Sequence, residues 1–336
     1  MRWDEQFMQL ALAEARRGEG LTRPNPPVGA VLVDARGEML AAGWHAKAGA
    51  AHAERDCLLK ISEGVDLSGA TLFVTLEPCC TVGRTAACVE LILKRGVGRV
   101  VVGVEDPNPA HAGAGLERLR AAGVEVVLGV CGEEAGALIE PFACWMGEGR
   151  PFVTLKMAMT LDGRIADARG MSKWISGEAA RAEVQALRRR VDAVMVGAET
   201  VRLDDPGLLP RPAEGRMPWR VVMGSDVPDE AAVLTDEAAA RTLVRGGDVC
   251  EVLRGLAAEQ DVMHLLCEGG GTLAGAMLAA GVVDELVLFV APKVMGADGR
   301  PVFNLTGLRM DALPALSILE VRRLDEDVMI RARVKE

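Results

Sequence analysis

Aromatic residues are scarce in this chain, which has no tyrosine, five tryptophans and six phenylalanines among its 336 residues. Leucine, valine, alanine and methionine must therefore fill the interior. Half of the residues are hydrophobic, which is enough for two cores, and the length exceeds the usual size of one domain. Apolar runs are short as well, and none approaches the ~18 residues of a membrane span. The sequence thus predicts two domains and no membrane insertion.

Basic residues are fewer than acidic ones: the chain has 38 lysines and arginines, 48 aspartates and glutamates, and a net charge of −10. Proteins that bind nucleic acid carry a basic footprint, so this balance disfavours such a partner while leaving room for a local basic patch. Eight cysteines without a recognisable signal peptide favour a reducing compartment. We expect a cytoplasmic protein that acts on a small molecule, and we also expect a homo-oligomer.

One group of residues carries the strongest signal: His52-Ala53-Glu54, then Pro78-Cys79-Cys80, then Cys88. The pattern H-x-E with a downstream P-C and a further cysteine is typical of zinc deaminases, which replace a ring amino group with oxygen from water. One imidazole and two thiolates would leave the fourth position of a tetrahedral zinc ion to water, whose pKa falls to about 7 on the metal. Glu54 is close enough to His52 to carry protons without binding the metal. We therefore hypothesise hydrolytic deamination.

Two adjacent cysteines leave the ligand set open. A closed structural site of His52 with Cys79, Cys80 and Cys88 is the main alternative, because Cys3His is a common structural set. Neighbouring side chains rarely converge on one tetrahedral ion, so one of Cys79 and Cys80 is expected to be a spectator. We favour Cys79 as the ligand, since it follows Pro78 as the deaminase pattern requires.

Two loops near this motif indicate what the site binds. Residues 81–87 contain one fixed cation, Arg84, with a glycine and two hydroxyls, a set that suits phosphate; an ordinary solvated turn is the alternative. Upstream, Asn25 lies between two prolines, which hold its amide group in place. That amide could donate one hydrogen bond to a heterocycle and accept another from it. His45 and His111 are interpreted as structural histidines.

Short β-rich runs alternate with helical segments in the first half of the chain. Strands are expected at residues 28–34, 39–44, 70–76, 97–104 and 124–130, and helices at residues 4–17, 51–61 and 115–121. The first helix carries Trp3, Phe7 and Leu10 at helical spacing, which predicts a buried stripe. This alternation predicts a sheet with helices on both faces, and a domain border near Arg150-Pro151.

The second half contains a strand with one lysine inside it and, further on, a glycine run. Burying the Lys156 ammonium is costly unless it meets an anion or a polar ligand; an edge lysine that reaches solvent is the alternative. Residues 262–268 form a β-rich run that leads into Gly269-Gly270-Gly271-Thr272 and a helical segment. The backbone N–H groups of such a run can approach phosphate, although a plain strand-to-helix turn explains the pattern equally well.

Taken in order, these segments resemble the bifunctional deaminase/reductase family of bacterial riboflavin biosynthesis. In the first half the resemblance is carried by residues 24–30, 52–54, 75–80, 83–85, 88 and 106–109, and the order of motifs in the second half extends it over nearly the whole chain. It implies an α/β protein with a cytidine-deaminase-like α/β/α domain in residues 1–148. It also implies a dihydrofolate-reductase-like α/β domain in residues 149–336.

The resemblance also implies roles for individual residues. In the first domain these are zinc ligation by His52, Cys79 and Cys88, proton transfer by Glu54, and substrate contacts from Asn25 and the ribose-phosphate loop with Arg84. In the second domain the implied NADPH contacts are Ala158, Trp174, Thr200, Asp204, Ser225, Gly270, Gly271 and Thr272. The implied substrate contacts are Ser172, Arg188, Leu208, Arg211 and Glu268, with Lys156 as a catalytic residue. Arg188 and Arg211 would clamp the substrate phosphate.

The reactions implied are zinc-dependent deamination of 2,5-diamino-6-(5-phosphoribosylamino)pyrimidin-4-one, then NADPH-dependent reduction of the ribosyl group to ribityl. A nucleoside or tRNA deaminase fused to an unrelated domain is one alternative, which a basic groove near Asn25 and Arg84 would favour. A non-catalytic, zinc-stabilised nucleotide-binding module is another, and it predicts that Glu54→Gln changes nothing.

Overall fold

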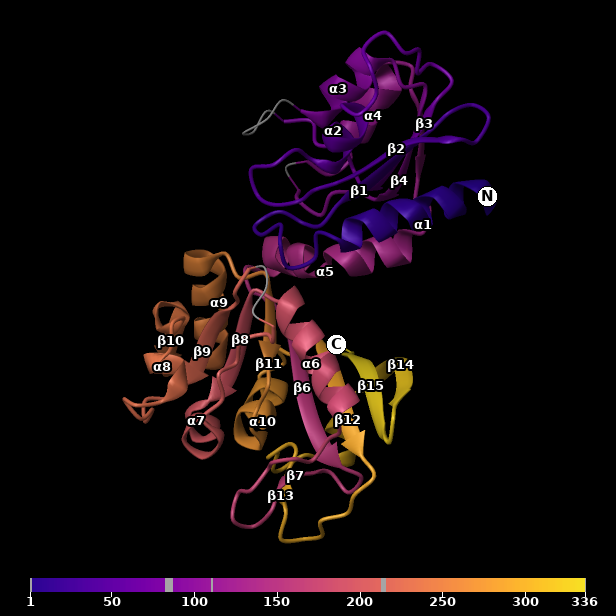
Figure 1. The fold of residues 1–336 in the computed structure, drawn as a ribbon. Coiled ribbons are helices and arrows are strands. Elements are labelled where there is room, and N and C mark those ends of the chain that lie inside the picture. Colours follow the sequence, from indigo (N-terminus) through magenta and orange to yellow (C-terminus); the bar gives the residue numbers. More distant parts are fainter. Residues whose placement is uncertain (1, 82–86, 110, 213–215, 336) are drawn as a thin grey trace. The chain divides into compact units, whose positions relative to one another are not determined.

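The structure, a computed structural model, describes residues 2–81, 87–109, 111–212 and 216–335. The chain divides into two compact units, Met1–Glu148 and Gly149–Glu336, and each has its own sheet and its own core (Figure 1). No helix within the described ranges combines the length and the apolar composition that a membrane crossing requires.

Unit 1 is built on a five-stranded sheet with the order β2-β1-β3-β4-β5. Its strands are β1 (Gly29–Val33), β2 (Met39–Trp44), β3 (Thr71–Leu76), β4 (Arg99–Val104) and β5 (Glu125–Leu128). β1 is antiparallel to β2 and β3, whereas β3, β4 and β5 are parallel. The helices are α1 (Arg2–Arg16), α2 (Ala53–Leu58), α3 (Cys88–Arg95), α4 (Ala114–Ala121) and α5 (Gly132–Glu148).

The period-two alternation of the strands places a separate core on each face of this sheet. On β3, Leu72 and Val74 face the core shared with α2, α3 and α4, whereas Phe73 faces the core shared with α1 and α5. All three side chains are fully buried. Unit 1 therefore has the three layers, helices on both sides of a sheet, that the sequence predicts (Figure 1).

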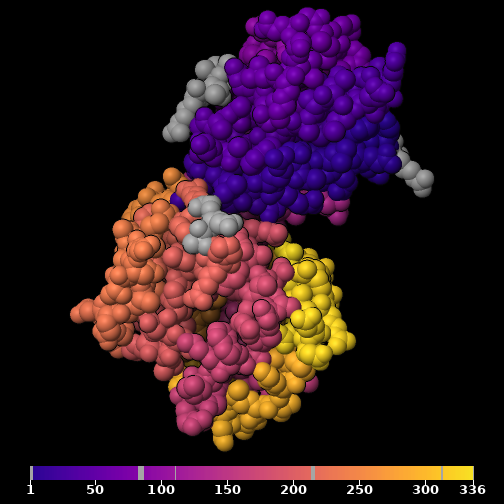
Figure 2. All heavy atoms as spheres, in the orientation of Figure 1, coloured from indigo at the N-terminus to yellow at the C-terminus, as the bar shows by residue number. Residues whose placement is uncertain are grey.

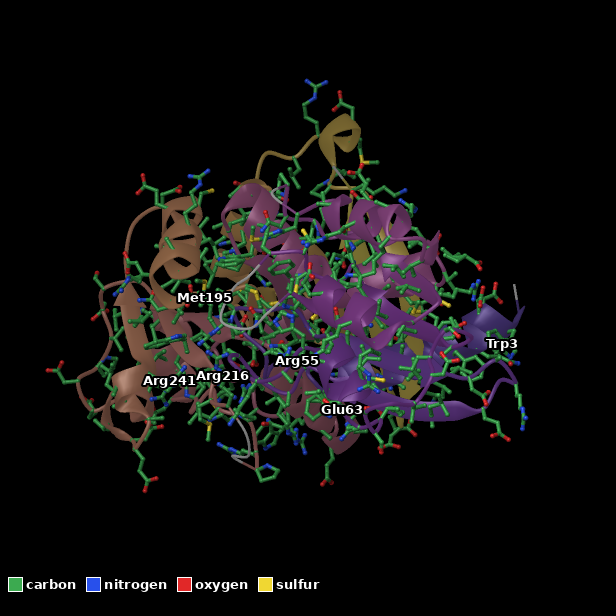
Figure 3. All side chains as sticks on the ribbon, turned by 90° about the horizontal axis from the view of Figure 1, so that it is seen from above. Trp3, Arg55, Glu63, Met195, Arg216 and Arg241 are labelled. Carbon is green, nitrogen blue, oxygen red and sulfur yellow. The ribbon has the colours of Figure 1, made fainter. Side chains whose placement is uncertain are left out.

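The face that α1 buries differs from the prediction. The stripe of Trp3, Phe7 and Leu10 is wrong as a buried face, because Trp3 is 41% and Leu10 46% exposed. The buried positions are instead Met8, Ala11, Leu12 and Ala15. Their spacing also fits one helix face, and alanine lets α1 lie directly on β1. Trp3 lies where α1 begins (Figure 3) and packs edge-on against Phe7 and Phe73.

Unit 2 is built on an eight-stranded sheet with the order β10-β9-β8-β11-β6-β12-β15-β14, with a two-stranded sheet of β13 and β7 beside it. Its strands are β6 (Phe152–Thr160), β7 (Arg164–Ala166), β8 (Ala193–Gly197), β9 (Trp219–Met223), β10 (Thr242–Arg245), β11 (His264–Cys267), β12 (Glu285–Ala291), β13 (Arg300–Pro301), β14 (Leu316–Leu324) and β15 (Asp327–Val334). Its helices are α6 (Glu178–Arg190), α7 (Ala198–Asp204), α8 (Ala232–Thr235), η1 (Ala239–Arg241), α9 (Val249–Gln260), α10 (Gly271–Ala279) and η2 (Met310–Ala312).

Six strands of this sheet, from β10 to β12, are parallel, and β15 and β14 continue it antiparallel. One face packs on α9 and α10, and the other packs on α6, α7 and α8. Met195 on β8 belongs to the α9 and α10 face (Figure 3). Because the parallel strands end at one edge, ligands of unit 2 are expected beyond the carboxyl ends of β6, β8 and β11.

Candidate active sites

The start of α2 positions the two central residues of the H-x-E motif. His52 has extended backbone angles, φ −68° and ψ 161°, and caps the helix, while Glu54 lies in its first turn. Gly43 on β2 lies so close to α2 that an added Cβ would collide with the backbone nitrogen of Cys57. This close contact fixes the position of α2 relative to the sheet, and it thereby fixes where His52 and Glu54 point.

Three donor atoms meet at this helix start. The ligating atoms of His52, Cys79 and Cys88 lie within 4.8 Å of one another, and no further His, Cys, Asp or Glu joins them among the described residues. His52 Nδ1 is 3.5 Å from each sulfur, and the backbone N–H of Cys88 donates to the Cys79 sulfur at 3.4 Å. Cys80 is not in the group; it is partly buried and packs against the core that α2, α3 and α4 share with the sheet.

This donor set fits a zinc ion that keeps one position open. One imidazole and two thiols match the ligands of catalytic zinc, and the closed four-ligand alternative with Cys80 lacks its fourth donor among the described residues. A hydrogen bond from the Cys88 thiol, together with His52, lowers the pKa of Cys79. The same bond and burial raise the pKa of Cys88. A divalent cation would remove this competition because it binds both sulfurs as thiolates.

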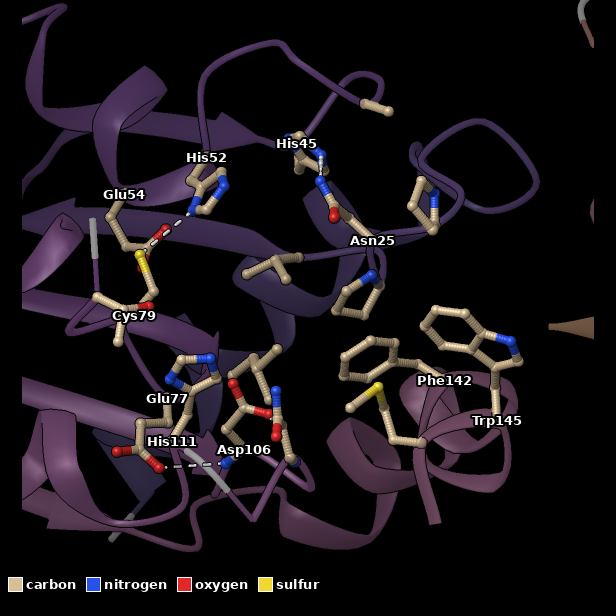
Figure 4. A pocket seen from close by; sticks show the side chains of 18 of the residues that line it. Asn25, His45, His52, Glu54, Glu77, Cys79, Asp106, His111, Phe142 and Trp145 are labelled. Carbon is tan, nitrogen blue, oxygen red and sulfur yellow. Dashed lines mark hydrogen bonds between the residues drawn. The ribbon is translucent and has the colours of Figure 1, made fainter. Parts of the chain in front are cut away.

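Glu54 is a buried carboxyl beside the three donors, and Figure 4 shows its carboxyl group directed towards Cys79. Burial is the main reason that its pKa is raised to about 7, and the negative charge on Cys79 adds to the effect. A carboxyl group that can take up and release a proton near neutral pH has the property that a proton shuttle needs.

Asn25 is oriented by a histidine that was expected to be structural. His45 Nδ1 lies 2.9 Å from the carbonyl oxygen of Ala51, which can only accept, so Nδ1 carries a hydrogen. Burial lowers the pKa of His45, so the ring is neutral and Nε2 accepts from Asn25 Nδ2 at 3.0 Å. The amide oxygen of Asn25 is then the end presented to a ligand. His45 therefore has a role in the site beyond packing (Figure 4).

A cavity of about 510 Å³ in unit 1 is lined by five of the residues described above: Asn25, His45, His52, Glu54 and Cys79. Its other walls include Asp106, Asn108 and His111 on one side and Phe142 and Trp145 from α5 on another (Figure 4). His111, like His45, was expected to be structural, but it lines this cavity. Arg84, the predicted phosphate contact, lies outside the described residues. Thr81, three positions before it, lines the cavity.

Unit 2 brings three charged side chains together: Lys156 within β6, Glu268 directly after β11, and Arg188 on α6. Arg188 on α6 donates to both carboxylate oxygens of Glu268, at 2.6 and 3.1 Å, and Lys156 Nζ lies 3.8 Å from the same carboxylate. Burial lowers the pKa of Lys156, and Glu268 offsets this only in part. Burial alone would raise the pKa of Glu268, but Arg188 and Lys156 outweigh it and lower the pKa.

The glycine run after β11 also lines the site. Gly270 caps α10 without a side chain, and its N–H donates to Thr200 Oγ1 on α7 at 3.0 Å. An added Cβ at Gly271 would lie 2.5 Å from the carbonyl oxygen of Pro301. The start of α10 thus carries no side chain at Gly270 or Gly271, and a helix start of this kind, lining the cavity, fits a dinucleotide phosphate.

The three charged side chains and the glycine run line one cavity of about 750 Å³. Figure 2 shows unit 2 hollowed on the face turned to the viewer. The predicted residues in its walls are Lys156, Ala158, Ser172, Trp174, Arg188, Thr200, Asp204, Leu208, Arg211, Glu268, Gly270, Gly271 and Thr272. Ser225 is not among them and is exposed just after β9. Arg181 and Gln185 also line the cavity but were not predicted from the sequence, although they stand seven and three residues before Arg188 and so share its helix face.

The two units therefore define an enzyme that joins a zinc-deaminase site to a nucleotide-binding site of the reductase type. Residues 1–104 match the family described as the cytidine and deoxycytidylate deaminase zinc-binding region, and residues 151–330 match the RibD C-terminal domain. A curated relative from Aquifex aeolicus (strain VF5), named riboflavin biosynthesis protein RibD, is 39% identical over 352 residues, covering 97% of both chains.

Two solved structures are similar over almost the full length. The RibD of Acinetobacter baumannii is 36% identical, with a TM-score of 0.91 over 100% of this chain and 99% of that one. A Thermotoga maritima protein, described as a diaminohydroxyphosphoribosylaminopyrimidine deaminase/5-amino-6-(5-phosphoribosylamino)uracil reductase, is 37% identical, with a TM-score of 0.92 over 99% of both chains. The chain belongs to the RibD family of riboflavin biosynthesis, and it is a zinc-dependent deaminase and an NADPH-dependent reductase. The two folds expected from the sequence are confirmed.

Proposed function

We propose that unit 1, residues 1–148, deaminates 2,5-diamino-6-(5-phosphoribosylamino)pyrimidin-4-one, and that unit 2, residues 149–336, reduces the ribosyl group of the product to ribityl. The observation that carries the first half is the convergence of His52, Cys79 and Cys88 beside the buried carboxyl of Glu54. The similar Thermotoga maritima protein, whose name contains both substrates, supports the choice of substrate.

In the deaminase site, His52, Cys79 and Cys88 would hold the metal. Zinc, when bound, supplies Lewis-acid activation of a water molecule. Glu54 would take a proton from that water and deliver it to the departing amino group, so that ammonia leaves and a ring carbonyl remains. Asn25, with its amide nitrogen occupied by His45, would accept from an N–H on the pyrimidine ring. Arg84 would bind the ribose phosphate.

In the reductase site, the dinucleotide would be held by the glycine run from Gly270 to Thr272 and by Ala158, Trp174, Thr200 and Asp204. Ser225 would contact a more distant part of the same dinucleotide. NADPH, when bound, supplies a hydride, here to C1′ of the ribosyl group. Lys156 would donate a proton to the ring oxygen as the sugar opens, and Glu268 would accept from a sugar hydroxyl. Hydride transfer needs no covalent bond between substrate and protein, so the protein contributes by positioning the reactants and by the charges that it places around them.

Four residues would bind the rest of the reductase substrate. Ser172 and Leu208 would contact its pyrimidine and ribosyl parts, and Arg188 and Arg211 its phosphate. Arg188 already donates to Glu268 and to the carbonyl of Leu209. The exposed Arg211 is therefore the better-placed phosphate ligand of the two, and Arg188 would share its guanidinium between phosphate and Glu268.

The test measures ammonia release and NADPH oxidation together, on zinc-loaded protein with the diaminopyrimidine ribosyl phosphate. Glu54→Gln should keep the metal and lose ammonia release by about 10²- to 10⁴-fold, while NADPH oxidation with pre-deaminated substrate continues. Lys156→Met should show the opposite pattern. Full ammonia release by Glu54→Gln would refute the proposed mechanism, and an equal loss of both steps in either variant would refute two independent sites.

We also propose a cytoplasmic location and a small-molecule partner rather than nucleic acid. All eight cysteines are free thiols, which suits a reducing compartment. The homo-oligomer stays a prediction; light scattering would compare the particle mass with the 35.6 kDa of one chain.

A further inference from the structure

Residues 172–177 form a strap along one wall of the unit 2 cavity. Five of the six, from Ser172 to Ser176, line the cavity. The strap contains no helix or strand, and among its carbonyls that of Gly177 accepts from the backbone N–H of Arg181 at the start of α6. The carbonyls before it need partners from other groups. Other parts of the unit must therefore fix its path.

Two cations bind three consecutive carbonyls of the strap: Lys293, which is distant in sequence, and Arg181 from α6, the helix that directly follows the strap. Lys293 Nζ donates to the carbonyl oxygens of Trp174 at 2.9 Å and Ile175 at 2.7 Å. Arg181 Nη1 donates to the carbonyl oxygen of Ser176 at 2.7 Å. The strap is thus held by charge-assisted hydrogen bonds, which are shorter and stronger than neutral ones.

Lys293 is itself fixed to the sheet. It stands two residues after β12, and its carbonyl oxygen accepts from the N–H of Leu161, the residue after β6, at 2.8 Å. β6 carries Lys156. The ammonium of Lys293 therefore links the strap to the strand that carries the charged cluster of the site.

Apolar burial does little to hold the strap, because Trp174 is 67% exposed and its indole lies over Arg181, with 4.8 Å from the guanidinium carbon to the ring centroid. Without polar anchors, a ligand that uses Trp174 would have to order the strap on binding and would lose affinity for that reason. We propose that Lys293 is a positioning residue for the reductase step, which holds the strap in the conformation that binds NADPH. This inference rests on the proposed placement of the reductase site in this cavity.

The test compares Lys293→Met, which removes the ammonium and keeps the chain length, with Lys293→Arg, which keeps N–H donors. Lys335→Met, at another exposed lysine of the same unit, is the matched control. NADPH affinity is read by equilibrium titration of the intact chain, with transfer of tryptophan fluorescence to bound NADPH. Steady-state rates then give KM and kcat for reduction, and ammonia release reports on unit 1.

Lys293→Met should raise the Kd and KM for NADPH about 5- to 10-fold with kcat changed less than about 2-fold, as expected for lost binding that is equal in ground and transition states. Lys293→Arg should restore affinity to within about 2-fold of the parent, and the Lys335→Met control and ammonia release should be unchanged. An unchanged Kd in Lys293→Met would overturn the inference, and so would a loss of ammonia release in parallel, because that reports general damage.

Failure of the proposed function would look different. Lys156→Met tests the cavity itself, and an unimpaired rate of reduction in that variant would remove the reductase site from this cavity. An unchanged NADPH affinity in Lys293→Met, with reduction lost in Lys156→Met, would leave the site in place and reject only the role of Lys293.

Discussion

Replacing Glu77 with glutamine should damage the deaminase pocket although Glu77 is not a predicted metal ligand. Glu77 follows β3 directly and is buried. One carboxylate oxygen accepts from the N–H groups of Gly115 at 2.8 Å and Leu116 at 3.3 Å. The other accepts from Asp106 at 3.1 Å and Gly113 at 2.9 Å. One side chain thus fixes the segment that places Asp106, Asn108 and His111 in the cavity wall (Figure 4).

The loss of stability follows from the number of hydrogen bonds that the Glu77 carboxylate accepts. Whichever way the glutamine amide turns, its NH2 group faces two backbone N–H groups that then have no acceptor. A buried donor without a partner costs about 1–3 kcal/mol, so the two together cost about 2–6 kcal/mol. Against a total stability of about 5–15 kcal/mol for a domain, that is enough to loosen the segment or to unfold unit 1.

The assay follows ammonia release and urea unfolding of Glu77→Gln, with Glu117→Gln on the exposed side of α4 as the matched control. We expect ammonia release to fall at least about 10-fold, because about 1.4 kcal/mol of lost positioning already gives that factor. Reduction of pre-deaminated substrate by unit 2 should be unaffected. Parent-like ammonia release and unfolding in Glu77→Gln would refute the reasoning that these four bonds hold the pocket wall.

Three further predictions concern the metal, a buried ion pair and a partly buried histidine. Removing zinc with a chelator should stop ammonia release, which zinc restores, while NADPH oxidation with pre-deaminated substrate continues throughout. Asp236→Ala should destabilise unit 2 by about 3–5 kcal/mol in urea unfolding, more than Arg220→Met, since it leaves the fully buried Arg220 guanidinium without its carboxylate, whereas Asp236 is 34% exposed to water. Burial lowers the pKa of His264 to about 4, below its unfolded value of 6.5, so the unfolded state binds the extra proton between these values and stability falls as pH falls through that window. The loss should reach roughly 3 kcal/mol near pH 4, and His264→Asn should remove this component of the urea midpoint's pH dependence.

Local patterns predicted the strands of unit 1 well because each strand is a short apolar run, and β1 and β3 are buried at every position. The run at residues 39–44 coincides with β2, and the run at 70–76 differs from β3 by one residue. The helix expected at residues 51–61 is shorter, from Ala53 to Leu58. His52 caps it in an extended conformation, and Arg95 donates to the carbonyl of Leu58 at its end and to those of Ile61 and Ser62 beyond it. Helix propensity contains no information about such a distant partner.

The candidate metal donors could also be predicted from the local sequence, because they follow the residue pattern of zinc deaminases. The role of His45 could not, because its two partners, Ala51 and Asn25, meet it only once the loops before β1 and after β2 lie together. Its position seven residues before His52, in a chain with four histidines, was the one available hint. The anchoring role inferred for Lys293 also depends on contacts with residues more than 100 positions away.

The three side chains in unit 2 show how Lys156 is placed beside a carboxylate that already has a partner. Arg188 binds both oxygens of Glu268, so that carboxylate is already paired before Lys156 is considered. At 3.8 Å, Lys156 Nζ is attracted by Glu268 but is beyond hydrogen-bond distance from it. Lys156 Nζ therefore keeps its hydrogens for a ligand of the cavity, which is proposed to receive a phosphorylated sugar. Removing Arg188 should for this reason draw Lys156 onto Glu268 and impair proton donation as well as substrate affinity.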